Sequence, residues 1–439
     1  MQRLQRFFGL DGPVPRWMAF LVRATPRPDE VRLVCLVLLL GFAAVGAGSW
    51  ITAFLNGRTL DGRPAGADFI AFYNGGRILN EFGGERLYDL PLQDRMYREA
   101  HPWDHDKTMW YVNAPFLAQA FRPLALLPYS VACIVWSVLS AAFYAAAVAL
   151  IWPRELPHRF LAAPVLAVAS FPPFALDAWL GGQLPPLTAL VLAAAFRLYR
   201  DRHFAWSGAV LALSLYKPTI ALPLVAFLFF AAEFRVVAGY VCGAVALAIV
   251  SLASVGVAGL RAFVDILKMY SRFTSGGPTP LSVDYKCVDL NHLVRSLMGG
   301  NASIATPVFF VLAAGAFLFV TMHWRKVKSG GGGEAMWAVG ITATLLLNLY
   351  VPLYDATLLA VSALITAGAI LKMPSPGVRP AFLALLMLLY VGGLFASPLG
   401  RLAGIQPYTV IIAIFGAFQL VVARAASRIS ACEQVAAAG

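Results

Sequence analysis

Long apolar runs constrain the fold of this 439-residue chain more than any other feature of its sequence. Residues 31–55, 131–152, 236–257 and 407–423 approach or exceed the roughly 20 apolar residues that a helix needs to cross the ~30 Å hydrocarbon core of a bilayer. Because lipid offers the backbone no hydrogen-bond partner, such runs are expected to be helices. The chain is 60% hydrophobic and 13% charged, whereas soluble domains average about 25% charged residues. The sequence therefore predicts an all-α polytopic membrane protein.

The apolar runs leave no room for a separate soluble domain, so we expect one integral membrane domain over residues 1–439. The run 31–55 is expected to be the first transmembrane helix, because it is too long for the apolar core of a signal peptide. Residues 56–128 mix charged and aromatic side chains, which predicts a first outer loop with short interfacial helices. Residues 129–424 hold the remaining helices and a second outer loop over 259–300.

The uneven distribution of positive charge predicts the orientation of the chain in the membrane. Lys and Arg gather in the short cytoplasmic loops of membrane proteins. If seven segments lie inside, the cytoplasmic side receives 19 of the 34 Lys and Arg but 8 of the 22 Asp and Glu. These segments are 1–32, 153–159, 197–203, 233–235, 325–334, 372–379 and 424–439. The arrangement predicts about twelve transmembrane helices, with both termini cytoplasmic. The excess charge then needs no nucleic acid partner.

The number of crossings depends on residues 205–232, which form either one long helix or two short helices that meet at Lys217-Pro218. Proline removes a helix hydrogen bond and disfavours a helical residue before it, so a break there is physically reasonable. Each half would be only about 13 residues long, which is shorter than a full span. Two short helices keep the later basic loops inside and put the break on the outer face.

Asp68 is the most informative polar residue of the chain. It lies just past the first apolar run, next to Phe69, Phe72 and Tyr73. A carboxylate at a membrane surface beside aromatic rings is suited to general-base chemistry on a lipid-borne substrate. The structural alternative is that Asp68 caps a short helix above these rings.

Three further groups fall on the same outer face. Lys217 is a cation at the edge of an apolar segment, where it either snorkels from a helix end or binds a lipid phosphate. Gly181-Gly182-Gln183 is either a tight turn or a backbone that lets a ligand approach closely. Tyr354 and Asp355 start a span, where Asp355 either caps the following helix or binds sugar hydroxyls.

The sequence contains only weak metal-binding patterns. His101 and His105 have the i, i+4 spacing of a helical metal pair, but Pro102 lies between them. The five cysteines include no C-x-x-C pair, so neither a disulfide framework nor a zinc site is expected. We expect no cofactor and assign no metal ligand, and metal dependence stays an open question.

Several short motifs, taken in order, resemble glycosyltransferase family 87, which includes the polyprenol-phosphate-mannose-dependent mannosyltransferases of the mycobacterial envelope. The resemblance extends over about residues 60–360 and rests on the order and spacing of the motifs rather than on any one of them. The motifs are Asp68-Phe69-x-x-Phe72-Tyr73-x-Gly75-Gly76-Arg77, Leu87-Tyr88-Asp89, Asn113-Ala114-Pro115-Phe116, Pro123-Leu124-Ala125-Leu126-Leu127-Pro128, Gly182-Gln183 and Lys217-Pro218.

The resemblance implies a GT-C type glycosyltransferase fold with an outward-facing cleft. It also implies a hexosyltransferase that moves a mannose-like hexose from a polyprenyl-phosphate donor to a lipid or glycan acceptor, with Asp68 as the catalytic base. Lys217, and more weakly Arg77, would neutralise the donor phosphate, and attack opposite the leaving group would invert the anomeric centre. The candidate substrate-binding residues are Tyr73, Gln183, Tyr354 and Asp355.

The chain departs from the family pattern at one place. Mycobacterial members carry a Ser-x-Ser-Trp-x-His-His type motif late in the chain, whereas the matching residues here read Tyr350-Val351-Pro352-Leu353-Tyr354-Asp355. The histidine is absent or replaced, which puts mannose and inositol lipids in doubt as the substrates, although a mannose-like hexose stays the expectation.

Two other classes of function stay open. A transporter or flippase of a lipid-linked sugar would share the amphipathic cleft, but internal repeats would be more typical of it. A structural subunit of an envelope complex would not need Asp68.

Overall fold

Helices form nearly all of the described structure, and no β-strand occurs among the described residues. The structure, a computed structural model, confirms the prediction of an all-α polytopic membrane protein. The residues that it describes are 27–56, 58–60, 62, 66–100, 109–156, 162–275, 284–329, 332–373 and 378–438.

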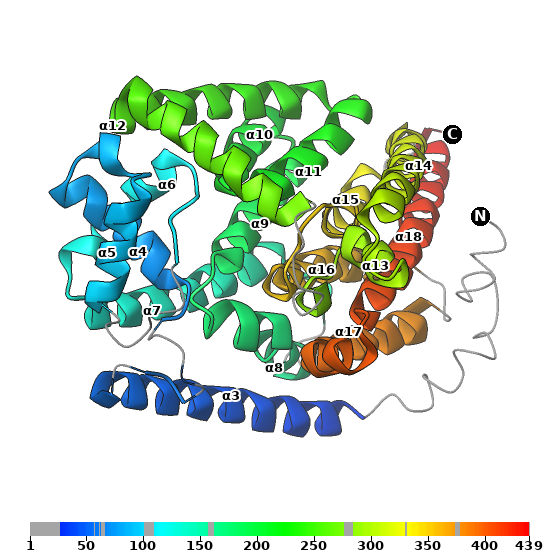
Figure 1. Cartoon of the computed structure of the whole chain (residues 1–439). Helices are drawn as coiled ribbons and strands as arrows, with labels where there is room; N and C mark the ends of the chain where they lie inside the picture. Colours follow the sequence, from blue (N-terminus) through cyan, green and yellow to red (C-terminus); the bar gives the residue numbers. More distant parts are fainter. Residues whose placement is uncertain are drawn as a thin grey trace.

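The first described helix, α3 (Pro28–Asn56), lies along one side of the molecule and contacts α8 (Ala162–Ala169) (Figure 1). Most of its apolar side chains are exposed, as expected for a helix that faces lipid. Short helices follow in the order α4 (Phe69–Glu81), η1 (Gly84–Arg86), α5 (Leu90–Ala100), α6 (Pro115–Phe121) and η2 (Leu124–Leu126).

The middle of the chain alternates long helices with short, buried ones. Helix α7 packs against α9, and α10 packs against both α9 and α12. Beside α8, the elements of this part are α7 (Tyr129–Ile151), the π-helical turn η4 (Pro173–Trp179), α9 (Pro185–Arg200), α10 (Phe204–Ala212), η5 (Leu213–Tyr216), α11 (Pro218–Phe230) and α12 (Phe234–Ser275).

The last part of the chain forms a helical group in which α15 packs against α14, α16 and α18 (Figure 1). Its elements are η6 (Asp284–Lys286), α13 (Leu290–Leu297), α14 (Ala302–Ser329), α15 (Gly333–Leu346), η7 (Leu353–Thr357), α16 (Leu358–Leu371), α17 (Val378–Ala403) and α18 (Pro407–Ala438).

The described residues contain eight helices that are long and apolar enough to cross a membrane, rather than about twelve. Three further apolar helices, Phe204–Tyr216, Pro218–Phe230 and Gly333–Leu346, are shorter than a full span. Short helices of this kind need protein around them, and the helix over Gly333–Leu346 is buried along nearly its whole length. The difference from the predicted number therefore lies largely in helices that are shorter than a full span.

The chain breaks at Lys217-Pro218, so the hypothesis of two short helices over 205–232 is confirmed. Lys217 has the non-helical angles φ −125° and ψ 77°, and Pro218 occupies the first turn of α11. Proline fits the first turn of a helix because no intrahelical partner exists there for its missing N–H. The break turns the chain back and leaves Lys217 at the junction.

The structure differs from the expected outer loop over 259–300, because α12 continues as a helix to Ser275. The helix kinks at Gly256, and α12 packs on η1 and α6. Phe263 contacts Tyr88 with their ring centroids 5.3 Å apart, and Ile266 is buried beside them. An apolar stripe at helical spacing thus covers the short helices that follow α3.

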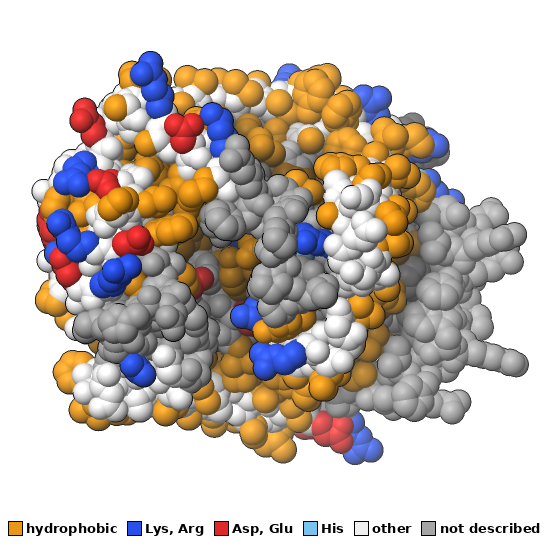
Figure 2. Space-filling view, in the orientation of Figure 1, with side chains coloured by type: hydrophobic (Ala, Val, Ile, Leu, Met, Phe, Trp, Pro, Cys, Tyr) orange, Lys and Arg blue, Asp and Glu red, His pale blue; other side chains and the backbone are white. Residues whose placement is uncertain are grey.

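Helix α4 is a buried helix rather than an amphipathic helix at the membrane surface. Ten of its 13 residues are buried. Helices α4, α5 and α6 share an apolar core with parts of α7 and α12, separate from the larger core formed by the other helices. Charged side chains gather on the surface of this end of the molecule, whereas apolar side chains cover much of the rest (Figure 2).

Candidate functional site

Asp68 stands at the N-cap position of α4, but its side chain makes no capping hydrogen bond. Its carboxylate instead accepts a hydrogen bond from the Nε2 of Gln183, 115 residues further along the chain. The Asp68 backbone N–H donates to the carbonyl of Gly181 at 3.2 Å. The structure therefore brings together Asp68 and Gln183, two residues that the sequence proposed separately, and it does not use Asp68 as a helix cap.

The neighbouring residue, Phe69, anchors Asp68 to the protein core. Phe69 is fully buried and stacks on Tyr129 and Trp136 of α7, with ring centroids 6.0 and 5.9 Å away. The indole of Trp136 donates a hydrogen bond of 3.1 Å to the carbonyl of Gly182. The same aromatic group thus holds the Asp68 segment and the turn before α9, so the two segments keep a fixed separation.

Close backbone contact between these segments requires glycine at position 182. Gly182 has φ +64°, in the left-handed region that favours glycine. A Cβ at this position would lie 2.2 Å from the carbonyl oxygen of Gly66. Glycine lets the turn approach residues 66–68 and present Gln183 to Asp68.

We expect Gly182→Ala to lower both the thermal stability and the activity of the protein. The left-handed backbone costs a non-glycine residue about 1–2 kcal/mol, and the clash with Gly66 must also move the turn. A displacement of about 1 Å at a reacting centre can lower a rate about 10²-fold. The matched control is Gly404→Ala, where φ is +67° and no atom lies within 4 Å of the added Cβ. Melting temperature and initial rate would show a loss of activity for Gly182→Ala alone, and equal activity in both variants would contradict the expectation.

Lys217 is positioned by the break between η5 and α11. Tyr216, the last residue of η5, forms a 2.6 Å hydroxyl–hydroxyl hydrogen bond with Thr188 of α9. Since Thr188 lies only five residues after Gln183, helix α9 fixes the relative positions of Gln183 and the Lys217 junction. Helix α11 also directs its positive N-terminal end toward this junction, which adds to the charge of Lys217.

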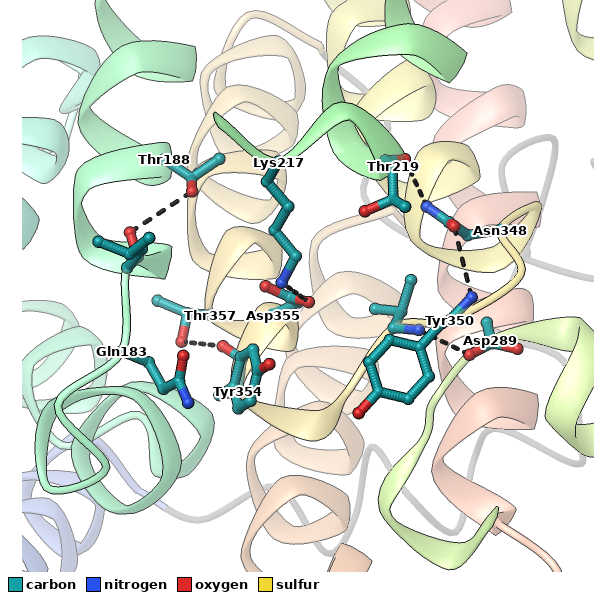
Figure 3. Close-up of polar contacts among 12 residues, drawn as sticks. Gln183, Thr188, Lys217, Thr219, Asp289, Asn348, Tyr350, Tyr354, Asp355 and Thr357 are labelled. Atoms are coloured by element: carbon teal, nitrogen blue, oxygen red, sulfur yellow. Dashed lines mark hydrogen bonds and ion pairs between the residues drawn. The ribbon is translucent and has the colours of Figure 1, made fainter. Parts of the chain in front are cut away.

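Lys217 forms an ion pair with Asp355, with Nζ 2.5 Å from Oδ2 (Figure 3). The lysine side chain is 20% exposed and the carboxylate 1% exposed. The Nζ atom also lies 4.8 Å from the centre of the Tyr354 ring, within the range of a cation–π contact. Asp355 is therefore the counter-ion of Lys217 and not the cap of the next helix.

The other carboxylate oxygen of Asp355, Oδ1, is buried and has no hydrogen-bond partner among the described residues. A buried carboxylate oxygen without a donor is costly, since desolvation is not compensated. A ligand hydroxyl or a water molecule is the kind of donor that would satisfy this oxygen. Asp355 thus has the capacity to bind a sugar hydroxyl that the sequence proposed for it.

Residues 347–357, which connect α15 to α16 and which we call the strap, carry Tyr354 and Asp355. The Nδ2 of Asn348 donates a 2.5 Å hydrogen bond to the carbonyl of Thr219, which lies two residues after Lys217 (Figure 3). The turn η7 of the strap packs against η4 and α9. The strap is therefore attached to the element that carries Lys217 and to the elements that flank Gln183.

Four residues proposed from the sequence surround one region of the molecule, namely Gln183, Lys217, Tyr354 and Asp355 (Figure 3). Asp68 joins them through its hydrogen bond with Gln183. The region combines a half-buried carboxylate with a partly shielded cation. Such a pair of opposite charges can remove a proton from one group while it stabilises negative charge on another.

Tyr73 and Arg77 are not brought to this region. The hydroxyl of Tyr73 is buried and donates to the carbonyl of Leu127 at 2.9 Å, and burial raises its pKa. Arg77 donates to Glu81 at 2.7 Å, a hydrogen bond that raises the pKa of its guanidinium. Nine residues of helix separate Arg77 from Asp68, a rise of about 13 Å. Both residues stabilise the α4–α6 end of the molecule, and we do not propose them as ligands of the substrate.

Two other family-like motifs also have structural roles. The hydroxyl of Tyr88 donates to the carbonyl of Asn113 at 2.7 Å, which links the Leu87-Tyr88-Asp89 motif to the Asn113-Ala114-Pro115-Phe116 motif. Asp89 accepts a 3.0 Å hydrogen bond from the backbone N–H of Leu92 in the first turn of α5. The hydrogen bond from Arg86 lowers the pKa of Asp89. These motifs hold together the helices on which Asp68 rests.

An apolar pocket of about 120 Å³ lies behind the Asp68 segment, between α3, α7 and the turn before α9. Its lining includes Trp50, Trp136 and Trp179 together with Gly66 and Gly182. An aromatic and apolar lining suits a hydrocarbon chain rather than a sugar. The pocket adjoins the charged region through residues 66 and 182.

A buried group of Cys287, Asp289 and His292 lies next to the strap and was not predicted from the sequence. The spacing C-x-D-x-x-H is the sequence pattern that could indicate a metal site here. An Asp immediately before a helix is also typical of an N-cap residue, so the pattern alone does not distinguish the two roles. The metal pair considered from the sequence, His101 and His105, lies outside the described residues.

The fold and the charged region define a polytopic membrane protein with an acid–base group and a cation beside an apolar pocket. Residues 111–349 match glycosyltransferase family 87. Because the match covers more than half of the chain, the protein belongs to glycosyltransferase family 87 and is a membrane glycosyltransferase. The matched residues include Gln183 and Lys217, whereas Asp68 and Asp355 lie outside them. None of the curated proteins and none of the solved structures compared with the chain matches it.

Proposed function

We propose that this glycosyltransferase moves a mannose-like hexose from a polyprenyl-phosphate donor to a hydroxyl of a lipid or glycan acceptor. The observation that carries the proposal is the convergence of Asp68–Gln183 and Lys217–Asp355, from distant parts of the sequence, on one region beside an apolar pocket. A soluble nucleotide-sugar donor would have no use for the apolar pocket, whereas a lipid-linked donor would.

Asp68 acts as the general base in this proposal. The acceptor hydroxyl gives its proton to the Asp68 carboxylate as its oxygen attacks the anomeric carbon of the donor sugar. The hydrogen bond from Gln183 holds the carboxylate in one orientation. Attack from the side opposite the leaving group inverts the anomeric centre.

Lys217 stabilises the leaving group. When the bond from the anomeric carbon to the phosphate oxygen breaks, the phosphate leaves with one more negative charge than it had in the donor. A cation next to the N-terminal end of α11 stabilises this increase, and it does so most effectively where water is scarce. Asp355 holds the Nζ in place, and its Oδ1 accepts a hydrogen bond from a sugar hydroxyl.

The positive-inside distribution of Lys and Arg supports an active site on the outer or periplasmic face of the plasma (inner) membrane, with both termini in the cytoplasm. The donor lipid then reaches Asp68 and Lys217 from the outer leaflet. The pocket between α3 and α7 would take part of its hydrocarbon chain.

Purified protein in liposomes tests the proposed reaction directly. We expect transfer of label from a radiolabelled polyprenyl-phosphate hexose to components of a lipid extract, and no transfer from a nucleotide sugar. Translocation of the labelled lipid without transfer would contradict the proposal in favour of a transporter. The absence of both transfer and translocation would favour a structural subunit. Protein denatured by heat before reconstitution is the control for spontaneous exchange.

A further inference from the structure

A thiol, a carboxylate and an imidazole meet in the protein interior just before α13. Cys287 and Asp289 are fully buried and His292 is 5% exposed. Each residue offers one ligand atom, and the three atoms all lie within 4.8 Å of one another. Two ligands of one tetrahedral zinc ion are about 3.5 Å apart, given bond lengths of about 2.0–2.3 Å, so small side-chain rotations close the remaining distance.

Asp289 organises this group through its backbone contacts. It accepts a 2.9 Å hydrogen bond from the backbone N–H of His292, which caps α13, and its Oδ1 lies 2.8 Å from the Nδ1 of the same residue. Its Oδ2 accepts a 2.8 Å hydrogen bond from the N–H of Val351. The Oδ2 also lies 3.0 Å from the Nδ1 of His292, so these contacts fix the orientation of both carboxylate oxygens. The imidazole of His292 and the carboxylate of Asp289 thus already face each other.

The chemistry of the three side chains selects the kind of ion. Thiolate and imidazole together favour zinc and related transition metals, whereas magnesium and calcium prefer oxygen ligands. A thiolate and a carboxylate buried together carry two negative charges that a divalent cation neutralises. We propose that Cys287, Asp289 and His292 bind a zinc ion, with displacement of the Cys287 thiol proton to solvent.

The zinc ion connects the start of α13 to the strap that carries Tyr354 and Asp355. Val288 donates to the carbonyl of Val351 at 2.8 Å, and Asn291 donates to that of Leu349 at 3.0 Å. Figure 3 shows Asp289 beside Tyr350 at one end of the strap, with the Lys217–Asp355 pair at the other. The ion therefore fixes the strap from the side opposite α9 and positions Asp355 without contact with the substrate.

The test measures metal in the full-length protein, purified without a histidine tag and dialysed against chelator-free buffer. We expect elemental analysis to find about one zinc per chain, as for a single site. After removal of the metal, added Zn²⁺ alone is expected to raise the melting temperature, because binding to the folded state stabilises it. Co²⁺ in place of zinc is expected to give a thiolate-to-metal absorption band. These readouts do not depend on sugar transfer, so they can succeed or fail independently of the proposed function.

Variants assign the metal to this group. We expect Cys287→Ser, Asp289→Asn and His292→Gln each to lower zinc affinity by more than about tenfold, a loss that even substitutions around metal ligands produce. Cys242→Ser, which changes an exposed cysteine of α12, is expected to keep the metal. Cys287→Ser changes a single atom, so it tests the role of this group in zinc binding even where a larger change impairs folding. Protein without zinc, or zinc content and Co²⁺ absorption unchanged in Cys287→Ser, would overturn the assignment.

Discussion

Asp68→Ala is expected to lower the rate of sugar transfer by about 10²–10⁴-fold, the contribution typical of a positioned general base. This corresponds to about 3–5.5 kcal/mol of transition-state stabilisation. The protein should still insert into the membrane and bind its donor, because Phe69 and not Asp68 anchors this segment in the core. Initial rates and donor binding in liposomes measure the two effects separately.

Asp68→Asn separates the proton-accepting role of Asp68 from its structural role. The amide oxygen still accepts the hydrogen bond from Gln183, but the group no longer takes up a proton at neutral pH. We expect Asp68→Asn to keep the melting temperature of the wild type but to have the low activity of Asp68→Ala. The control is Asp265→Ala, which changes an exposed carboxylate of α12 whose partner is Lys268. Full activity in Asp68→Asn would eliminate the base assignment.

Lys217→Ala is expected to weaken donor binding and also to destabilise the fold. A hydrogen bond to a charged group contributes about 1.5–3 kcal/mol, which corresponds to roughly 10- to 150-fold in kcat/KM for the donor. The substitution also leaves Asp355 as a buried carboxylate without its counter-ion, which costs about 3–5 kcal/mol. The two effects have different origins, and a second substitution separates them.

The double variant Lys217→Ala with Asp355→Ala removes both charges of the pair. We expect it to recover most of the stability that Lys217→Ala loses, because no unpaired charge remains buried. Donor binding should stay weak, because the phosphate still lacks its cation. Lys268→Ala, at an exposed lysine of α12, serves as the control. Thermal melts and rates over a donor titration measure both quantities, and an unchanged dependence on donor concentration in Lys217→Ala would rule out the phosphate-binding role.

The parts of this protein that follow local rules could be predicted from the sequence. Apolar length and the absence of backbone partners in lipid account for the transmembrane helices, and the geometry of proline accounts for the break at Lys217-Pro218. The ordered motifs identified the family, which the match over residues 111–349 confirms. The same motifs predict Asp68, Gln183 and Lys217 as site residues.

Roles that depend on which side chains meet could not be predicted in this way. Tyr73 and Arg77 belong to the same motif as Asp68, yet one is buried against Leu127 and the other pairs with Glu81. Their spacing along α4 turns them away from Asp68, but spacing alone does not say what the opposite face of the helix contacts. The continuation of α12 beyond Gly256 also depends on a distant contact, since its apolar stripe is covered by η1 and α6.

The sequence determines that this chain is a helical membrane protein of glycosyltransferase family 87, because these properties follow from composition and short motifs. Tertiary structure decides which groups form the site. Gln183 reaches Asp68 because Gly182 fits against Gly66, and Asp355 pairs with Lys217 because the strap is tied to Thr219 and Asp289. These contacts join residues 62 to 138 positions apart, and the packing that produces them is a property of the whole fold and of no local segment.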